Sequence, residues 1–400
     1  MDICVISNLF PPEVVGGAEK HAKADVNELV NRGHDVSVIT TRSSSGGTYF
    51  SFEESELGGA TVYRFTPLNA YSPIEHQSVS AWKKPIQHVV DIWNPHVYLL
   101  VKKKLCQISP DIVHIHNHSG LSPSVFAAVS SHEIPVVHTL HDYEALHVRT
   151  NLFDGEKISD PGIGMKPYQK IYRQLVEPHL DYVVSPSQFV LEKHHSEGVY
   201  STVPCSRVPL GISSKSTDSV SSRPSNSDQL QLMFAGQHTH QKGIDILIKA
   251  VRKSSLENLH LNIYGKGPES SKLEDLASDE PRITFHGFVD DEELQDAYAA
   301  SHFTVVPSRW YDNSPMVIYE SYNRGTPVIG ANIGGIPELI TDGETGILFA
   351  PNDVDSLQGA LERAASLPYD EIQTQVEETK SYCISNHIDE IISIYEDILR

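Results

Sequence analysis

The residues best placed to do chemistry are two acids in one stretch of the C-terminal half, residues 305–349. Asp312 lies in a loop after an apolar run that is typical of a buried strand, and Glu320 follows eight positions later in a short helical pattern. Ser314 is predicted to be the N-cap of that helix and Pro315 its first residue, because these residue types are favoured there. The stretch is therefore expected to form strand, loop, helix and second strand.

The start of this helix could bind an anion. Its first backbone N–H groups have no partner within the helix, and the helix dipole places a partial positive charge there. We expect the amides of Ser314, Met316 and Val317 to face the same space as the two acids, whose carboxylates could accept hydrogen bonds from a vicinal diol. This set suits a sugar nucleotide, which presents a diphosphate, a ribose diol and sugar hydroxyls. An ordinary capped helix with a surface glutamate is the alternative.

The chain around this stretch is predicted to form two α/β domains. Four hundred residues are enough for two domains of ordinary size. Helical and strand patterns alternate, which indicates parallel sheets. We expect an N-terminal domain at 1–212, a Ser-rich linker at 213–229, a second domain at 230–385 and a final helix at 386–400.

The composition of the chain limits which partners it can bind and in which compartment it is expected. The net charge of −21 opposes non-specific binding to nucleic acid, so none is expected as a partner. The four cysteines are scattered and lack CxxC spacing, which predicts reduced thiols rather than a disulfide framework or zinc site. There is no apolar run of about 18 residues that would span a membrane, and because Met1 leads straight into the first strand we expect no signal peptide. We therefore expect a cytoplasmic protein.

Residues 82–104 form a local basic segment in this acidic chain. Lysines stand at both ends of the segment, and apolar and aromatic residues lie between them. Such a segment could contact an anionic membrane surface or a lipid-linked substrate from the cytoplasmic side. The alternative is a helix that buries its apolar face and leaves its lysines in water.

The N-terminal domain opens as a strand, a loop with Gly16 and Gly17, and a helix, which is a Rossmann-like beginning. The loop lacks GxGxxG and the second strand ends without an acid, so no nicotinamide cofactor is expected. The paired glycines allow the backbone to approach a ligand, unless they form only a flexible turn. Further along, His141 follows a strand, at the sheet edge where open α/β sheets bind ligands.

Three histidines at alternate positions, His114, His116 and His118, suggest a metal site at first sight. They would share one face of a strand that should be buried on both faces, and no acid or cysteine nearby would complete a set of four ligands. We therefore do not expect zinc on this strand. No Asp-x-Asp pattern lies in the predicted loops, so no obligatory metal is expected.

The acidic stretch resembles family 4 of the retaining glycosyltransferases. An acid, seven further residues and a second acid, Glu320, precede a Gly-Thr-Pro-Val strand, as in that family. The first acid of the family is usually Glu, and Asp312 keeps the charge with a side chain one methylene shorter. Residues 334–338, GGIPE, and 342–346, DGETG, also resemble it. The resemblance covers most of the chain because the N-terminal glycines, the strand histidines and the Thr-Leu-His context of His141 occur in the same order.

The resemblance implies the GT-B fold, in which two Rossmann-like domains face each other across a cleft and the last helix crosses back to the first domain. It implies transfer of a hexose from a nucleotide-diphosphate sugar to a hydroxyl acceptor, with retained configuration and no metal. The N-terminal domain would bind the acceptor, a glycan or lipid-linked glycan, as in polysaccharide biosynthesis. A nucleotide-sugar binder that is not catalytic, or that acts differently, for example as an epimerase, is the alternative.

The resemblance also implies roles for particular residues. His141 would orient the sugar, Lys242 would offset charge on the leaving diphosphate, Asp312 would bind sugar hydroxyls and Glu320 the ribose diol. The family usually has Arg where this chain has Gln237, and Arg309 or His238 could replace that charge. The full expected donor-binding set is Gly16, Gly17, Gly236, Gln237, Lys242, Gly287, Phe288, Asp312, Asn313, Ser314, Pro315, Met316 and Glu320.

Overall fold

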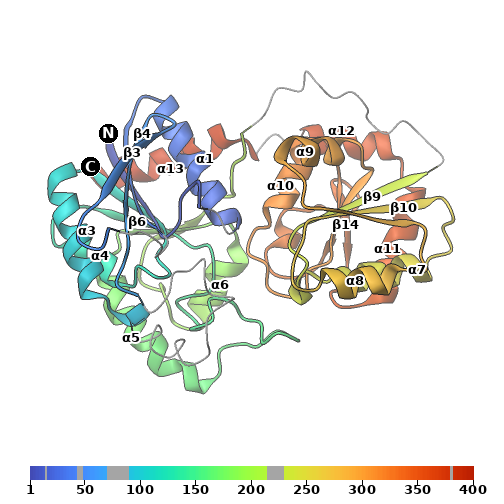
Figure 1. Ribbon diagram of the computed structural model, residues 1–400, viewed down its shortest axis with the longest axis horizontal. Coiled ribbons are helices and arrows are strands. Elements are labelled where there is room, and N and C mark those ends of the chain that lie inside the picture. Colours follow the sequence, from blue (N-terminus) through green and yellow to red (C-terminus); the bar gives the residue numbers. More distant parts are fainter. Residues whose placement is uncertain (14–15, 43–47, 70–89, 214–228, 379–381) are drawn as a thin grey trace. The chain divides into compact units, whose positions relative to one another are not determined.

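The chain folds into two compact units, coloured along the sequence in Figure 1. Unit 1 comprises Met1–Asn151, Pro161–Ser213 and Ile384–Arg400, and unit 2 comprises Leu152–Asp160 and Ser214–Cys383. The structure, a computed structural model, describes residues 1–13, 16–42, 48–69, 90–213, 229–378 and 382–400. Most of the predicted linker therefore lies outside the described residues.

Unit 1 is built on an eight-stranded sheet in the order β3-β4-β2-β1-β5-β6-β7-β8. Its strands are parallel except for the antiparallel pair β3 and β4. All residues of β1 after Asp2 are buried, as expected for a parallel sheet covered on both faces. The strands are β1 (Asp2–Ser7), β2 (Asp35–Thr41), β3 (Glu53–Leu57), β4 (Ala60–Phe65), β5 (Ile112–Asn117), β6 (Val136–Thr139), β7 (Tyr182–Ser185) and β8 (Cys205–Arg207).

The last helix of the chain belongs to unit 1, as the GT-B resemblance predicted. Ile388, Ile391 and Tyr395 of this helix join the apolar core formed by β1, β2 and the first helix. Figure 1 shows the two helices, α1 and α13, side by side. The helices of unit 1 are α1 (Gly17–Asn31), α3 (Pro95–Ile108), α4 (Ser124–Ser130), α5 (Lys166–Val176), α6 (Gln188–Ser196) and α13 (Ile384–Leu399).

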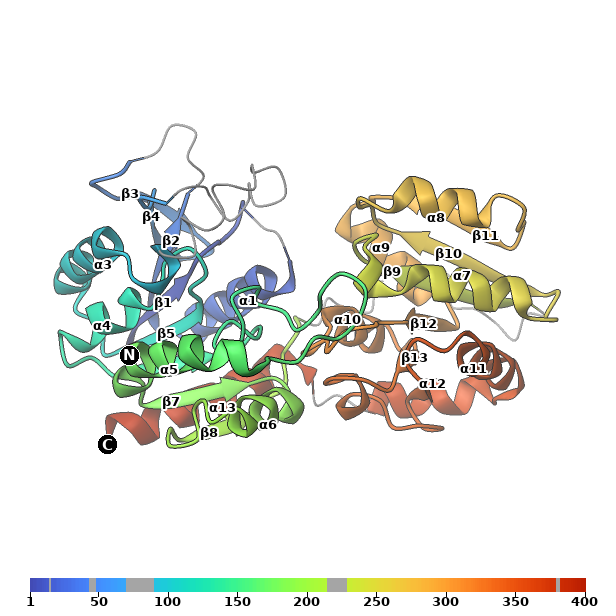
Figure 2. The same cartoon turned by 90° about the horizontal axis from the view of Figure 1, so that it is seen from below.

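Unit 2 contains a six-stranded parallel sheet in the order β11-β10-β9-β12-β13-β14 (Figure 2). The chain builds one half of the sheet outward from β9, then returns to place β12 on the other side of β9. Ligands bind at such a reversal, beyond the carboxyl ends of the strands. The strands are β9 (Leu230–Ala235), β10 (Leu259–Tyr264), β11 (Ile283–Gly287), β12 (Phe303–Val306), β13 (Val328–Ala331) and β14 (Gly346–Phe349).

Helices connect the strands of unit 2, so the predicted α/β class with parallel sheets is confirmed for both units. Residues 152–160, which interrupt unit 1 in sequence, also belong to unit 2, where the ring of Phe153 lies 6.2 Å from that of His240. The helices of unit 2 are α7 (Ile244–Lys253), α8 (Ser270–Ala277), α9 (Asp291–Ala299), α10 (Met316–Asn323), α11 (Val354–Ser366) and α12 (Tyr369–Glu378).

The basic segment at 82–104 is described only from residue 90 onward, and α3 forms most of that part. The helix buries Val97, Leu100 and Val101, and Lys104 Nζ lies 4.0 Å from the centre of the Tyr63 ring. This part of the segment therefore packs on unit 1 through its apolar face, and membrane contact stays a prediction. None of the helices formed by the described residues has the length and apolar character needed to cross a membrane.

Candidate active site

The loops that follow β9 and β12 meet at the carboxyl edge of the unit 2 sheet. Gly243 is the N-cap of α7 with a φ of +70°, and a Cβ built on it would lie 1.9 Å from the carbonyl oxygen of Pro307. The N–H of Arg309 donates to the carbonyl oxygen of Gln241 over 2.9 Å. Only glycine allows this contact, so the sequence Lys-Gly before α7 holds one loop against the other.

This contact brings Lys242 to Asp312. The Lys242 Nζ donates to Asp312 Oδ2 over 2.8 Å, and the same oxygen accepts hydrogen bonds from Ser308 Oγ (3.1 Å) and Trp310 Nε1 (3.2 Å). Asp312 and the neighbouring Asn313 are buried, whereas the side chain of Lys242 keeps 26% of its exposure. Three donors thus fix the carboxylate of Asp312, and the ammonium group of Lys242 that pairs with it remains accessible to solvent.

The backbone of Asp312 is fixed by the turn that follows β13. Gly334 has a φ of +61°, and a Cβ on it would lie 2.4 Å from the Asp312 carbonyl oxygen. The Gly335 N–H donates to that same oxygen over 2.8 Å. The Gly-Gly pair of the GGIPE motif therefore has a mechanical role, because it supports the loop that carries the acid.

Helix α10 begins one residue later than predicted. Met316 is its first residue and Pro315 occupies the N-cap position with an extended backbone, so the prediction of Ser314 as N-cap is wrong. Ser314 Oγ instead lies 2.6 Å from the hydroxyl of Tyr319, which offers it a partner within the next turn. The amides of Met316 and Val317 still open the helix, where N–H groups have no intrahelical acceptor.

Glu320 lies one helical turn after Met316, on the same face of α10. Its Oε2 accepts a hydrogen bond of 2.9 Å from the hydroxyl of Tyr298, which is fully buried. Burial and the charge of Glu320 raise the pKa of the Tyr298 hydroxyl, so it stays a proton donor. This hydrogen bond fixes one carboxylate oxygen of Glu320 and so fixes the orientation of its side chain.

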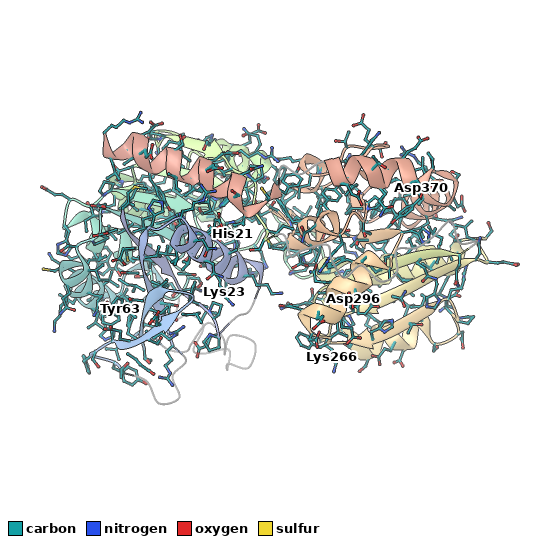
Figure 3. The ribbon with its side chains drawn as sticks, turned by 90° about the horizontal axis from the view of Figure 1, so that it is seen from above. His21, Lys23, Tyr63, Lys266, Asp296 and Asp370 are labelled. Carbon is teal, nitrogen blue, oxygen red and sulfur yellow. The ribbon has the colours of Figure 1, made fainter. Side chains whose placement is uncertain are left out.

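The other expected donor-binding residues of unit 2 lie at the same sheet edge. Gly236 follows β9 directly, and Gln237 beside it is exposed. Gly287 ends β11, and Phe288 after it is 79% exposed. A Cβ on Gly287 would lie 3.0 Å from Cε of Lys266, an exposed residue after β10 that Figure 3 labels.

Neither residue considered as a substitute for the missing arginine offers a free charge. The guanidinium of Arg309 pairs with Asp245, with Nη1–Oδ1 and Nη2–Oδ2 distances of 2.7 and 2.8 Å. His238 Nδ1 contacts Ser270 Oγ at 2.9 Å, and burial lowers the pKa of this histidine, so it is neutral. The position where the family usually has Arg is therefore occupied by the exposed, uncharged side chain of Gln237, and neither Arg309 nor His238 replaces the missing charge.

In unit 1, Gly16 and Gly17 begin α1. Gly16 is the N-cap, and its N–H donates to Glu19 Oε2 over 2.7 Å. An acid of the first turn therefore already occupies one amide of this helix start. A phosphate at Gly16 would have to displace that carboxylate, whereas an uncharged hydroxyl could share the space.

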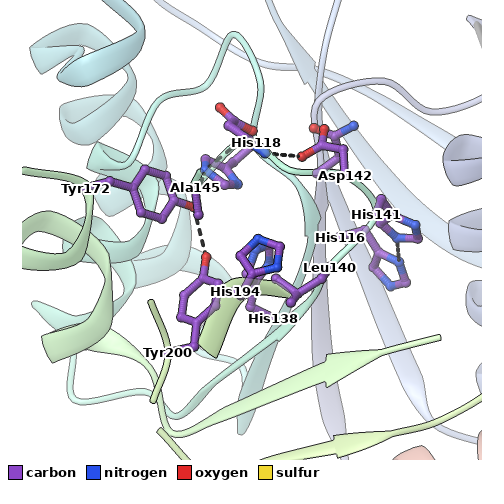
Figure 4. A pocket seen from close by; sticks show the side chains of 12 residues that line it. His116, His118, His138, Leu140, His141, Asp142, Ala145, Tyr172, His194 and Tyr200 are labelled. Atoms are coloured by element: carbon purple, nitrogen blue, oxygen red, sulfur yellow. Dashed lines mark hydrogen bonds and ion pairs between the residues drawn. The ribbon is translucent and has the colours of Figure 1, made fainter. Parts of the chain in front are cut away.

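His141 lies just beyond β6, at the carboxyl edge of the unit 1 sheet. Its Nε2 is 3.2 Å from Nδ1 of His116, as Figure 4 shows. Burial is the main cause that lowers the pKa of His141, to about 3, and the charges of neighbouring histidines add to it. His141 is thus a neutral hydrogen-bonding group at physiological pH rather than a cation or a general acid.

A polar pocket adjoins His141, lined by the ends of β5 and β6 and by side chains of α5 and α6 (Figure 4). Burial raises the pKa of Asp142 in this pocket to about 6, and burial together with Asp142 raises that of Glu144. The hydroxyl of Tyr172 lies 3.0 Å from His118 Nε2 and 3.1 Å from the hydroxyl of Tyr200. The pocket therefore presents many groups that can bind hydroxyls.

The strand histidines contact one another and groups on other elements. His114 bonds to the hydroxyls of Tyr395 (2.6 Å) and Thr139 (2.7 Å) through its two ring nitrogens. His118 faces the pocket and His116 faces His141. The rings of His114 and His116 have their centroids 4.3 Å apart, because alternate positions of β5 lie on one face. The expectation that no acid lies near these histidines is wrong, since His116 Nε2 is 3.6 Å from Asp25 Oδ2 and His118 Nε2 is 3.6 Å from Glu144 Oε2.

Comparison with known proteins decides the family. Residues 15–215 match the model of Glycosyltransferase Family 4, and residues 216–381 match that of Glycosyl transferases group 1. The chain belongs to glycosyltransferase family 4. An uncharacterised glycosyltransferase of Methanocaldococcus jannaschii is 26% identical over 92% of this chain and 89% of its own. The glycogen synthase of Mycobacterium tuberculosis is 26% identical over 90% of this chain and 85% of its own.

The fold of this family 4 glycosyltransferase is also that of solved GT-B structures. HepE of Anabaena, solved in complex with UDP, has a TM-score of 0.70 at 16% identity, with 99% of this chain and 100% of that one covered. The expected GT-B fold is therefore confirmed.

Sequence reasoning missed three residues of the glycosyltransferase's unit 2 edge. Trp310 and Tyr298 anchor the two acids through hydrogen bonds, and Lys266 supplies an exposed cation. Lys266 lies in the Gly-rich loop after β10, a stretch that in the family lines the nucleotide pocket, but it is absent from the expected donor-binding set. The two anchors carry no signal in the sequence, since only the fold brings Tyr298 of α9 against α10.

The Gly334 contact generates a first prediction. Gly334→Ala forces a Cβ against the Asp312 backbone at a positive φ, so we expect it to reduce the free energy of unfolding by about 1–3 kcal/mol. Gly359→Ala is the matched control, because a Cβ there meets nothing within 4 Å in α11. The control should stabilise the protein by roughly 0.5–1 kcal/mol. Differential scanning calorimetry measures both, and equal effects of the two variants would contradict the assigned contact.

Proposed function

We propose that this glycosyltransferase moves a hexose from a nucleotide-diphosphate sugar to a hydroxyl acceptor with retention of anomeric configuration. The observation that carries the proposal is the pairing of Lys242 with Asp312 beside the start of α10, at the strand reversal of unit 2. A cation, free helix amides and two fixed carboxylates are the groups that a diphosphate and a set of hydroxyls require.

Each part of the donor has a partner in this arrangement. The ammonium of Lys242 and the amides of Met316 and Val317 bind the diphosphate, and Glu320 accepts hydrogen bonds from the ribose diol. Asp312 accepts hydrogen bonds from the sugar hydroxyls. Phe288, which is largely exposed, offers a face on which the base can stack. HepE, which has the same fold, was solved with UDP, and this supports a nucleotide as the ligand.

The transfer step requires stabilisation of negative charge on the leaving diphosphate. Lys242 supplies it, because its ammonium can turn from Asp312 toward the phosphate as charge grows there. The leaving phosphate takes the acceptor proton on the same face of the sugar, so the C–O bond to phosphate breaks while the new glycosidic bond forms. Neutral His141 orients the sugar. No metal ion is needed in this scheme, since lysine and amides neutralise the charge.

The acceptor is proposed to approach from unit 1. The pocket beside His141 carries Asp142, Glu144 and Tyr172, groups that recognise hydroxyls rather than apolar surfaces. A glycan or the sugar part of a lipid-linked glycan has this chemistry. Polysaccharide biosynthesis is the process in which such an acceptor is extended.

One observation favours a second candidate, a nucleotide-sugar binder without transferase activity. Gln237 replaces the cation expected beside the diphosphate, and Arg309 is held by Asp245. The electrostatic contribution to leaving-group departure then rests on Lys242 alone at this loop. Donor binding without turnover over a broad panel of acceptors would select this candidate.

Donor binding tests the role of Glu320. UDP-, GDP- and ADP-sugars are screened by thermal shift, because a ligand of the native state raises the melting temperature. With the sugar nucleotide that stabilises the wild type, we expect Glu320→Ala to weaken binding by roughly tenfold or more, as for loss of hydrogen bonds to a charged group. Tyr298→Phe, which keeps the carboxylate, should lose much less. Unchanged affinity in Glu320→Ala would remove this assignment.

Transfer itself tests the role of Lys242. Lys242→Gln keeps a hydrogen-bond donor but no charge, so we expect kcat to fall by about 10²–10³-fold with a smaller change in KM. Lys249→Gln, on the exposed part of α7, is the control and should leave kcat unchanged. Proton NMR of the first product shows whether the anomeric configuration is retained. An inverted product would overturn the proposed mechanism.

Gln237→Arg tests the missing charge. If the diphosphate lies at the β9 loop, the added guanidinium should preserve or tighten donor binding, by roughly threefold to tenfold. The gain should shrink at high salt, because the exposed position is screened. Gln358→Arg, on α11 beside Glu362, adds the same charge elsewhere and should not change donor affinity. Weaker binding in Gln237→Arg would place the diphosphate away from this loop.

A further inference from the structure

A second cluster of chemically capable side chains lies between α1 and α13 in unit 1. His21 and Asp25 stand one turn apart on α1, and His387 faces them from α13. Figure 3 labels His21 on α1, next to the C-terminal helix. The exposed fractions of the three residues are 0%, 1% and 4%, so the cluster is shut off from solvent.

The polar atoms of this cluster converge at distances longer than an ordinary hydrogen bond to a carboxylate. His21 Nε2 and His387 Nε2 each lie 3.4 Å from Asp25 Oδ1. Both nitrogens of His21, both oxygens of Asp25 and Nε2 of His387 have no hydrogen-bond partner within the part of the chain that the structure describes. Buried polar atoms are rarely left in this state, and a buried carboxylate needs a positive partner.

The tautomer of His387 shows where in the cluster a positive charge is needed. Its Nδ1 lies 2.7 Å from the carbonyl oxygen of Pro209, which can only accept, so Nδ1 carries the hydrogen. In a neutral ring Nε2 then presents a lone pair, and this lone pair faces the oxygen of Asp25. Either a proton or a metal ion must lie between the two atoms.

The distances distinguish these two cations. An N–H donor to a carboxylate lies about 2.7–2.9 Å from the oxygen, which is shorter than either contact here. Ligands bound at about 2.0–2.1 Å in a tetrahedron around zinc lie about 3.3–3.4 Å from one another. Two of the three separations, from Asp25 Oδ1 to each imidazole nitrogen, are 3.4 Å and match edges of such a tetrahedron.

We propose that His21, Asp25 and His387 bind one divalent transition-metal ion of the zinc type. The three ligand atoms lie within 4.8 Å of one another, and two imidazoles with one carboxylate suit Zn²⁺. His21 and Asp25 have the i, i+4 spacing that places two ligands on one helix face. His116 Nε2, 3.6 Å from Asp25 Oδ2, borders the fourth position, which it or a water molecule fills.

The carbonyl of Pro209 acts as the outer partner that fixes the ring of His387, as second-shell groups commonly do for metal-binding histidines. The ion joins the first helix of the chain to the last one. It serves the fold of unit 1 and takes no part in the sugar transfer proposed above, in which Lys242 and helix amides neutralise the diphosphate.

Metal content and cobalt spectroscopy test the site. Full-length protein without a polyhistidine tag is stripped with a chelator and titrated with Co²⁺ or Zn²⁺. We expect about one ion per chain, the visible absorption of tetrahedral cobalt, and a melting temperature that rises by several degrees with Zn²⁺ and falls again with chelator. A featureless cobalt titration, together with a melting temperature that ignores both reagents, would overturn the proposal and leave a buried His387–Asp25 ion pair in its place.

Variants locate the ion. Asp25→Asn and His387→Gln should each lose the bound metal and the stabilisation by Zn²⁺. His194→Gln is the matched control, because His194 is a fully buried histidine of unit 1 outside the cluster, and this variant should keep one ion. Metal retained in both ligand variants would contradict the assignment. If the variants do not fold, the titration of the wild type with Co²⁺ and Zn²⁺ is the test of the site. Donor binding, followed by thermal shift, reports separately on the transferase site.

Discussion

Close approach of backbone to backbone is the constraint on which the unit 2 edge depends. Gly243 touches the Pro307 carbonyl and Gly334 touches the Asp312 carbonyl, and neither contact tolerates a side chain. These contacts hold three successive loops at fixed spacing. Main-chain packing therefore sets the positions of Asp312 and Lys242, so that their side chains meet without further movement of the loops.

This rigidity gives the Lys242–Asp312 pair its chemical value. In the pair, each group holds the other in place and compensates its charge. A ligand with a diphosphate and neighbouring hydroxyls can offer a new partner to each of them at the same time, so neither charge is left unpaired on binding. Interactions that strengthen as the leaving group gains charge act on the rate rather than on ground-state affinity.

The sequence predicted the parts of this site that follow from local pattern. The strand–loop–helix order around Asp312 and Glu320 was found, because apolar periodicity and Gly-Pro punctuation fix it locally. The first residue of α10 was placed wrongly because the hydroxyl of Ser314 has a tertiary partner in Tyr319 that no local rule contains. The pairing of Arg309 with Asp245 was missed for the same reason.

The cluster of His21, Asp25 and His387 shows more clearly what local sequence patterns cannot predict. The sequence pattern of β5 groups three histidines within one strand, at alternate positions. The convergent set comes instead from α1 and from α13, which are close only after the sheet has formed. Spacing along a chain predicts such sites when all ligands lie in one element, and it fails when the last ligand comes from the far end.

The return of α13 to unit 1 has a consequence for synthesis on the ribosome. Ile388, Ile391 and Tyr395 complete an apolar core whose members from other elements lie between residues 3 and 208. That core stays open to water while unit 2 is being made, since α13 is translated after unit 2. A nascent chain of this design must tolerate an unfinished first half, and loss of its final turns would leave that surface permanently uncovered.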